Sequence, residues 1–233
     1  TTLHALLPHR IVVHTHSVRT IALAIRADAE ARLAERLDGL KWLWVPYCKP
    51  GLPLTLAVAE RLAAGAVDIL VLGNHGLVVG GATVTDAAAL LAQVERRLDA
   101  PIRKVVEPAS PAAPPDRSGL AVREPAHPRT HILARDHLQL AWATAGSLYP
   151  DHVIFLGPAA ARLGDADAAQ RGSKLFLQAG RGAMLAAETT ASADELALCL
   201  ALVLERVPED ATLRYLTTEQ EAELLDWDAE KYR

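Results

Sequence analysis

Two histidines separated by one residue, His14 and His16, are the first side chains whose types and spacing could carry chemistry. They follow the β-branched run Ile11-Val12-Val13, which predicts a buried strand. Because alternate residues of a strand face the same side, we expect both imidazoles to point the same way, with Cβ atoms roughly 6–7 Å apart. Two such nitrogens can share one cation at about 2.1 Å each. The pair also has an ordinary interpretation, as hydrogen-bonded histidines at a strand end.

A third histidine, His75, lies in the turn Gly73-Asn74-His75-Gly76, directly after a predicted buried strand at residues 68–72. Strand ends in α/β folds commonly present functional groups. Three histidines from two strand ends can form an open three-ligand site for a metal ion, suited to Lewis-acid chemistry. The alternative for His75 is a turn residue bonded to the backbone. No GxGxxG motif follows a strand, so no dinucleotide-binding residues are predicted.

The helices and strands that position these side chains are predicted from hydrophobic periodicity and from the glycines and prolines that end each element. Ser17 and Thr85 are expected to cap helices, and Gly180-Arg181-Gly182 predicts a hairpin turn. Strands are predicted at 11–13, 42–45, 68–72, 77–79, 152–156, 174–178 and 183–187, and helices at 18–26, 27–37, 54–64, 85–105, 135–147, 193–206 and 218–227.

Composition bounds the class of protein. The chain has 233 residues, of which 51% are hydrophobic and 22% charged, so a disordered or fibrous protein is excluded. A net charge of −4 with interspersed signs gives no basic face, and no nucleic-acid partner is expected. The apolar runs fall well short of the ~20 residues that a membrane helix needs. The two cysteines form no CxxC spacing and no signal peptide is visible, so a cytoplasmic location is expected.

The domain division is predicted from proline. Six of the fourteen prolines lie between Pro108 and Pro128. Proline at this density removes amide donors and fixes φ, so residues 107–128 are predicted to be an extended linker. The linker would join a first lobe, residues 1–106, to a second lobe, residues 129–233.

The segments IVVHTHS, VPYCKPG and LGNHGLVVGG resemble the class II aldolase/adducin family. The resemblance implies a layered α/β/α core in residues 1–106, followed by a smaller α/β lobe. It implies that His14, His16 and His75 bind a divalent metal, with Zn²⁺ expected. It also implies a lyase that cleaves a carbon–carbon bond of a ketose phosphate or related hydroxyketone through a metal-stabilised enediolate. PDHVIFLGP, the GRG turn and YLTTEQEAELLDW are similar to the aldolase portion of proteins that fuse a rhamnulose-phosphate-type aldolase to a short-chain dehydrogenase.

The same resemblance leaves the reaction open in two ways. The family's metal site also serves sugar-phosphate 4-epimerases and dehydratases, and adducin-like members are non-catalytic interaction modules that lack the metal ligands. The family's members assemble as homo-oligomers, so a tetramer is the expected state. Its proton-donating tyrosine cannot be matched to one of the four tyrosines present.

A catalytic carboxylate is the piece of the family's site that the sequence does not supply. The family's glutamate aligns four residues before His4, immediately upstream of Thr1. Glu60 and Glu95 are predicted to face solvent from their helices, and Asp68 lies at the far end of its strand. The chain from Thr1 is therefore expected to bind metal with little lyase activity, because loss of a general base typically costs about 10²–10⁴-fold. His127, His131, His137 and His152 match no ligand spacing and are predicted to be surface or linker histidines.

Overall fold

The computed structural model describes residues 3–63, 65–104, 121–165 and 171–226, which form two compact units. The first comprises Thr1–Pro101 and Ala211–Arg214, and the second Ile102–Asp210 and Tyr215–Arg233. The division thus lies at Pro101/Ile102, whereas the sequence placed it after residue 106. The second unit spans more of the chain than the first, so it is not the smaller lobe that was expected. Most of the predicted linker, residues 107–120, lies outside the described residues.

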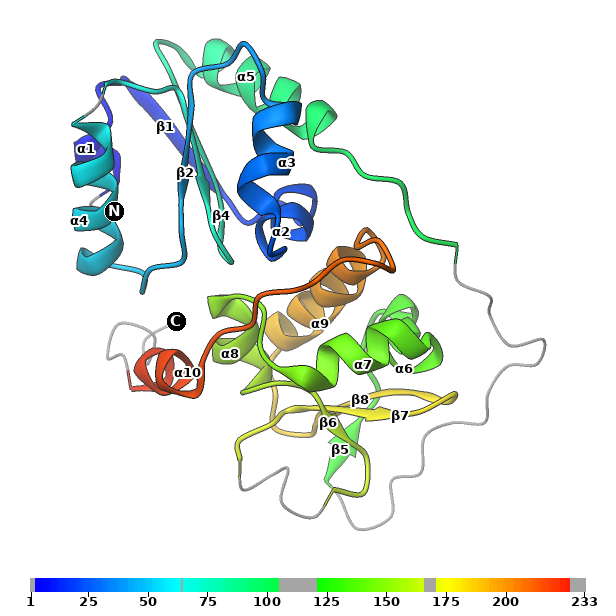
Figure 1. Ribbon diagram of the computed structural model, residues 1–233. Coiled ribbons are helices and arrows are strands. Elements are labelled where there is room, and N and C mark those ends of the chain that lie inside the picture. Colours follow the sequence, from blue (N-terminus) through cyan, green and yellow to red (C-terminus); the bar gives the residue numbers. More distant parts are fainter. Residues whose placement is uncertain (1–2, 64, 105–120, 166–170, 227–233) are drawn as a thin grey trace. The chain divides into compact units, whose positions relative to one another are not determined.

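The first unit is a four-stranded sheet between two layers of helices (Figure 1). The strands follow the order β1-β4-β3-β2, with β2 parallel to β3 and the other two pairs antiparallel. Helices α1 and α4 lie on one face of the sheet, and α2, α3 and α5 lie on the other. This is the layered α/β/α core that the family resemblance implied. Its elements are α1 Leu3–Leu6, β1 Ile11–Thr15, α2 Val18–Ala24, α3 Ala29–Arg36, β2 Trp42–Val45, α4 Leu52–Leu62, β3 Ile69–Leu72, β4 Gly76–Gly81 and α5 Val84–Arg97.

Two apolar cores hold these layers together, and strand β3 shows how one sequence supplies both. Ile69 and Val71 pack into the core under α2, α3 and α5, whereas Leu70 and Leu72 pack into the core under α1 and α4. All four residues of this strand are buried. A strand covered on both faces is apolar at every position, which explains the unbroken run of aliphatic residues.

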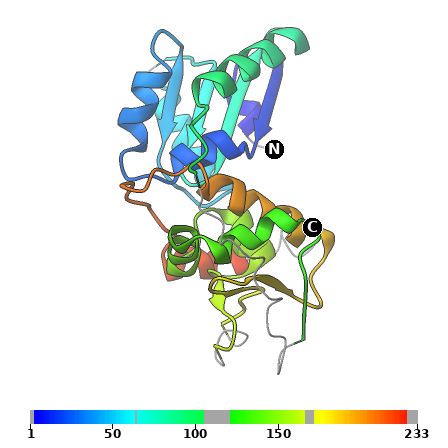
Figure 2. The same ribbon diagram turned by 90° about the vertical axis from the view of Figure 1, so that its right-hand side faces the viewer.

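Of the two helix caps predicted in this unit, one is correct and one is wrong. Ser17 caps α2 as predicted, because its Oγ accepts a hydrogen bond from the N–H of Thr20 at 3.3 Å. The N-cap of α5 is Thr83 rather than Thr85, and Thr83 and Asp86 form a reciprocal capping box. Helix α5 lies along the sheet (Figure 2) and ends at Arg97 rather than near residue 105. Pro101 explains the earlier end, since the residue before a proline is disfavoured in helical conformation.

The second unit contains another four-stranded sheet, of order β5-β8-β7-β6, together with helices. The predicted hairpin is present, with β7 and β8 antiparallel around the Gly180-Arg181 turn. The segment from 152 to 156, predicted as a strand, is instead part of helix α8. Pro150 at the first helical position and Asp151 in the first turn favour that helix. The elements are β5 Val122–Arg123, a 3₁₀ turn Pro128–His131, α6 Ile132–Arg135, α7 His137–Ala145, α8 Pro150–Leu156, β6 Ala161–Arg162, β7 Leu175–Gln178, β8 Gly182–Ala186, α9 Ala191–Leu204 and α10 Thr218–Leu225.

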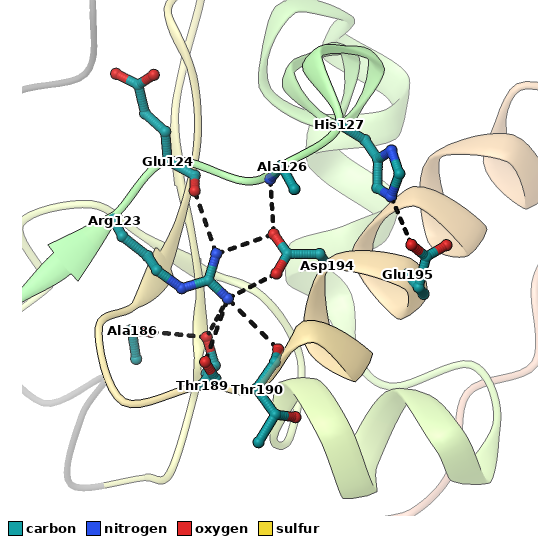
Figure 3. Close-up of polar contacts among 9 residues, drawn as sticks. All are labelled: Arg123, Glu124, Ala126, His127, Ala186, Thr189, Thr190, Asp194 and Glu195. Atoms are coloured by element: carbon teal, nitrogen blue, oxygen red, sulfur yellow. Dashed lines mark hydrogen bonds and ion pairs between the residues drawn. The ribbon is translucent and has the colours of Figure 1, made fainter.

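A polar cluster joins the edge strand β5 to the start of α9 in the second unit (Figure 3). Both carboxylate oxygens of Asp194 accept hydrogen bonds from Arg123, at 2.9 and 2.7 Å, and Oδ1 also accepts one from the N–H of Ala126 at 2.7 Å. Arg123 donates further to Thr189, at 3.0 Å to Oγ1. Because protein groups pair with the charges of both Arg123 and Asp194, the cluster stabilises the contact between β5 and α9.

Among the described residues, no helix has the length and apolar character needed to cross a bilayer.

Candidate metal centre

His14 lies near the end of β1, where the neighbouring strand fixes the direction of its ring. It pairs with Val78 of β4, and its Nδ1 is 3.0 Å from the carbonyl oxygen of Leu77. Since a carbonyl can only accept, Nδ1 carries the proton and the Nε2 lone pair lies on the far side of the ring. That Nε2 is 3.1 Å from Nε2 of His16. The two imidazoles of the His-x-His pair therefore converge, as their shared strand face predicted.

His75 is held in the tight turn between β3 and β4. Its N–H donates to the carbonyl of Leu72 at 3.1 Å, and the side chain is buried. The preceding residue, Asn74, has a left-handed φ of 50°, a conformation that asparagine tolerates better than most residues. Asn74 also ties the turn to the short returning segment of the same unit, because its Nδ2 donates to the carbonyl of Arg214 at 2.8 Å. The turn is thus fixed on both sides of the imidazole.

The three histidines form a nearly equilateral group. Their ring centroids are 4.9 Å apart for His14 and His16, 5.1 Å for His14 and His75, and 5.0 Å for His16 and His75. One ligand nitrogen from each lies within 4.8 Å of the others. In a tetrahedral zinc site with bonds of about 2.1 Å, the nitrogens are about 3.4 Å apart. Small side-chain rotations bring the group to that geometry, so these residues fit a divalent cation with a position left for substrate.

Gly76 allows the turn and strand β1 to approach this closely. A Cβ at this position would lie 2.5 Å from the carbonyl oxygen of Thr15, 3.1 Å from Cδ2 of His16 and 3.4 Å from Cε1 of His14. Any side chain would therefore push the His-x-His pair away from His75. From local sequence this glycine is only part of a turn. Its role in the site comes from the antiparallel pairing of β1 with β4, which local sequence does not reveal.

The carboxylates considered from the sequence lie elsewhere. Asp68 stands before β3, at the end opposite His75, and its Oδ1 is 2.8 Å from Nε2 of His9. Glu95 does not face solvent as predicted, because its side chain is only 22% exposed and it forms an ion pair with Arg19 at 3.4 Å. Among the described residues, the close-set group of metal-ligating atoms consists of the three histidines and contains no carboxylate.

The four histidines of the second unit do not form another cluster among the described residues. Two of the predicted surface positions are wrong. His152 is completely buried in α8, where burial lowers its pKa to about 4. His131 is half-buried, and its Nδ1 accepts a hydrogen bond from the N–H of Ala183 at 3.1 Å. Both are structural, as their contacts with the surrounding helix and hairpin show.

Comparison with known proteins points to one family. Residues 1–100 match the family described as the class II aldolase and adducin N-terminal domain. A protein of Bacillus subtilis (strain 168), named "Uncharacterized oxidoreductase YuxG", is 38% identical over 84 residues. That similarity covers 36% of this chain and 12% of the relative, so the chain corresponds to a small part of that protein. No solved structure gives a significant match.

Proposed function

We propose, because residues 1–100 match the class II aldolase and adducin N-terminal domain, that the chain is part of a metal-dependent aldolase acting on a ketose phosphate or related hydroxyketone. The observation that carries the proposal is the convergence of His14, His16 and His75, from two strand ends of this domain, with ligand nitrogens within 4.8 Å of one another. Adducin-like modules lack the metal ligands, so the retained triad favours an enzyme.

The triad residues would hold the cation, and the elements around them would keep its ligands in place. Neutral imidazoles suit this role because they bind a divalent ion without cancelling its charge. A bound divalent cation supplies Lewis-acid polarisation of a substrate carbonyl. The bond from His14 Nδ1–H to the Leu77 carbonyl directs Nε2 toward the site, which is the usual way that a protein fixes the tautomer of a ligand histidine.

The chain's own contribution to substrate binding at this site is orientation by a rigid turn. Asn74 and the backbone hydrogen bonds of the turn hold His75 at the end of the sheet. The imidazole of His75 is therefore already in place before substrate binds. Positioning of this kind is one of the larger sources of rate enhancement in enzymes. Proton transfer needs a carboxylate, and the resemblance places that glutamate immediately upstream of Thr1.

The experiment that tests this function is a cleavage and condensation assay with the zinc-loaded full-length protein. A panel of ketose 1-phosphates is assayed for release of dihydroxyacetone phosphate, and a panel of aldehydes for condensation with it. We expect turnover with at least one sugar, and loss of turnover in His75→Ala. Epimerised or dehydrated product without carbon–carbon cleavage would instead identify a sugar-phosphate 4-epimerase or dehydratase.

The name of the Bacillus subtilis relative does not change this proposal. The matched stretch covers 12% of that protein, whereas the triad lies entirely inside the family domain of this chain. The homo-oligomeric state, with a tetramer expected from the resemblance, stays a prediction that light scattering can measure.

A further inference from the structure

A cavity of about 190 Å³ in the second unit lies outside the proposed metal site and is lined by three arginines. Arg103, Arg129 and Arg135 line it together with Glu205, and the side chains of Ile102 and Ile132 contribute apolar wall. Three guanidinium groups around one small space repel each other unless negative charge compensates them. Their protein partners show how much of that charge the chain supplies.

Arg103 is fixed in place but not fully hydrogen-bonded. Its Nη1 donates to Oδ2 of Asp136 at 2.5 Å, and its Cζ lies 5.5 Å from the ring centroid of Trp142. The side chain is only 11% exposed, and Nε and Nη2 are buried with no hydrogen-bond partner among the described residues. Both nitrogens have an accessible area below 1 Å², so a molecule in the cavity does not contact them directly. Arg103 therefore acts on the cavity through its positive charge, which the bonded carboxylate of Asp136 partly offsets.

Arg129 is oriented by a buried carboxylate. Oε2 of Glu205 accepts hydrogen bonds from Arg129 Nε at 3.1 Å and Nη2 at 2.7 Å, and Oε1 accepts one from Arg206 Nη1 at 2.8 Å. Both oxygens of Glu205 are therefore occupied, and its side chain is only 3% exposed. Nη1 of Arg129 keeps a donor that no described protein group accepts. Glu205 thus orients Arg129 and also pairs with Arg206.

Arg135 supplies the least constrained donors at the cavity. Its Nε donates to the carbonyl of Arg181 at 3.0 Å, and neither terminal nitrogen has a hydrogen-bond partner among the described residues. A carbonyl carries no net charge, so the positive charge of Arg135 is uncompensated. With the ion-pair partners included, four arginines (the three that line the cavity and Arg206) and two carboxylates (Asp136 and Glu205) surround the cavity, which leaves a net charge of +2.

We propose that this cavity binds the phosphate group of a small phosphorylated metabolite. A phosphate monoester carries about −1.5 to −2 charges at pH 7, which matches the excess charge of the lining. Planar guanidinium groups bind phosphate oxygens in pairs, with charge-assisted hydrogen bonds. The volume equals that of about six water molecules at roughly 30 Å³ each, enough for the phosphate and a short carbon chain against Ile102 and Ile132. The site is independent of the metal-binding triad.

The test is calorimetric titration of the full chain, held metal-free with a chelator, with glycerol 3-phosphate and with inorganic phosphate at constant ionic strength. We expect one saturable site per chain. Arg135→Gln should weaken binding at least tenfold without unfolding, because Arg135 gives up only one bond to a backbone carbonyl. Arg96→Gln is the matched control: it removes an exposed arginine of α5 with the same change of charge, and it should leave affinity unchanged.

Four results decide whether a phosphate group binds in this cavity. Saturable binding that survives in His75→Ala and is lost in Arg135→Gln supports the proposal, whatever the outcome of the aldolase assay. Absence of saturable binding overturns it, as does equal weakening by Arg135→Gln and Arg96→Gln, which indicates a general charge effect. Loss of phosphate binding in His75→Ala would place the anion at the triad and overturn the proposal as well.

Discussion

Replacing Gly76 by alanine should damage the proposed metal site through geometry alone. The added Cβ would lie 2.5 Å from the carbonyl oxygen of Thr15, and real Cβ contacts are essentially never shorter than 3.0 Å, so the end of β1 must move by at least 0.5 Å. His14 and His16 move with that strand. Metal–ligand distances tolerate only about ±0.2 Å. We therefore expect zinc affinity to fall at least tenfold, within the roughly 10–100-fold range seen when support around ligands is lost.

The same substitution should also lower the free energy of unfolding by about 1–3 kcal/mol, as overpacking does. Gly81→Ala separates the two effects, because it places a Cβ 2.6 Å from the backbone nitrogen of Ala87 at the other end of the same strand. Urea unfolding should show a loss in both variants. Competitive titration of zinc against a chromophoric chelator should show weakened binding in Gly76→Ala only. Equal affinity in Gly76→Ala and the unsubstituted chain would refute the argument that this glycine sets the spacing of the triad.

Three further predictions concern stability. The pKa of His152 is about 4 in the folded chain and 6.5 ordinarily. Between these pH values the unfolded chain therefore binds more protons than the folded chain. The free energy of unfolding should be highest above pH 6.5 and should fall by about 3 kcal/mol as the pH drops toward 4. Urea unfolding across this range should show the loss, and His152→Gln should remove it. Asn74→Ala should cost about 1–2 kcal/mol, from the lost bond to Arg214 and the left-handed φ; an unchanged urea midpoint would argue against the tether. Asp194→Ala should lower the melting temperature of the second unit, because it leaves the guanidinium of Arg123 without its carboxylate partner. Calorimetry that shows no shift in melting temperature would contradict this.

The sequence predicted the first unit well because its signals are local. Most of its strands and helices were marked by short apolar runs, helical periodicity or a cap, whereas helix α1 was not predicted and the layered arrangement came from the family resemblance. The convergence of His14, His16 and His75 was also predictable, since a His-x-His strand and a strand-end turn constrain where imidazoles can lie. That they bind a metal stays a prediction.

The features that sequence missed depend on contacts between distant residues. Asn74 is tethered to Arg214, which lies 140 residues away, and no local pattern reports that bond. The helical state of residues 152–156 was missed because a short apolar run is compatible with either a strand or a buried helix. The orientation of Glu95 depended on Arg19, which comes from another helix.

The arginine-lined cavity was missed for a different reason. Arginine is frequent throughout this sequence, so its composition gave no sign that three of these side chains share one space. Arg103 precedes the proline-rich segment, and Arg129 and Arg135 follow it. Only the folded second unit brings them together. Glu205, the residue directly after α9, lines the same cavity.

The central claim is that the histidine triad binds one divalent ion, and zinc content after equilibrium dialysis tests it most directly. The protein, His14→Ala, His75→Ala and the control His137→Ala, which replaces an exposed histidine at the start of α7, are dialysed together against dilute zinc and measured by elemental mass spectrometry. We predict about one zinc per chain in the unsubstituted protein and in His137→Ala, and essentially none in the other two. Stoichiometric zinc retained by His75→Ala, or no zinc in the unsubstituted chain, would contradict the account.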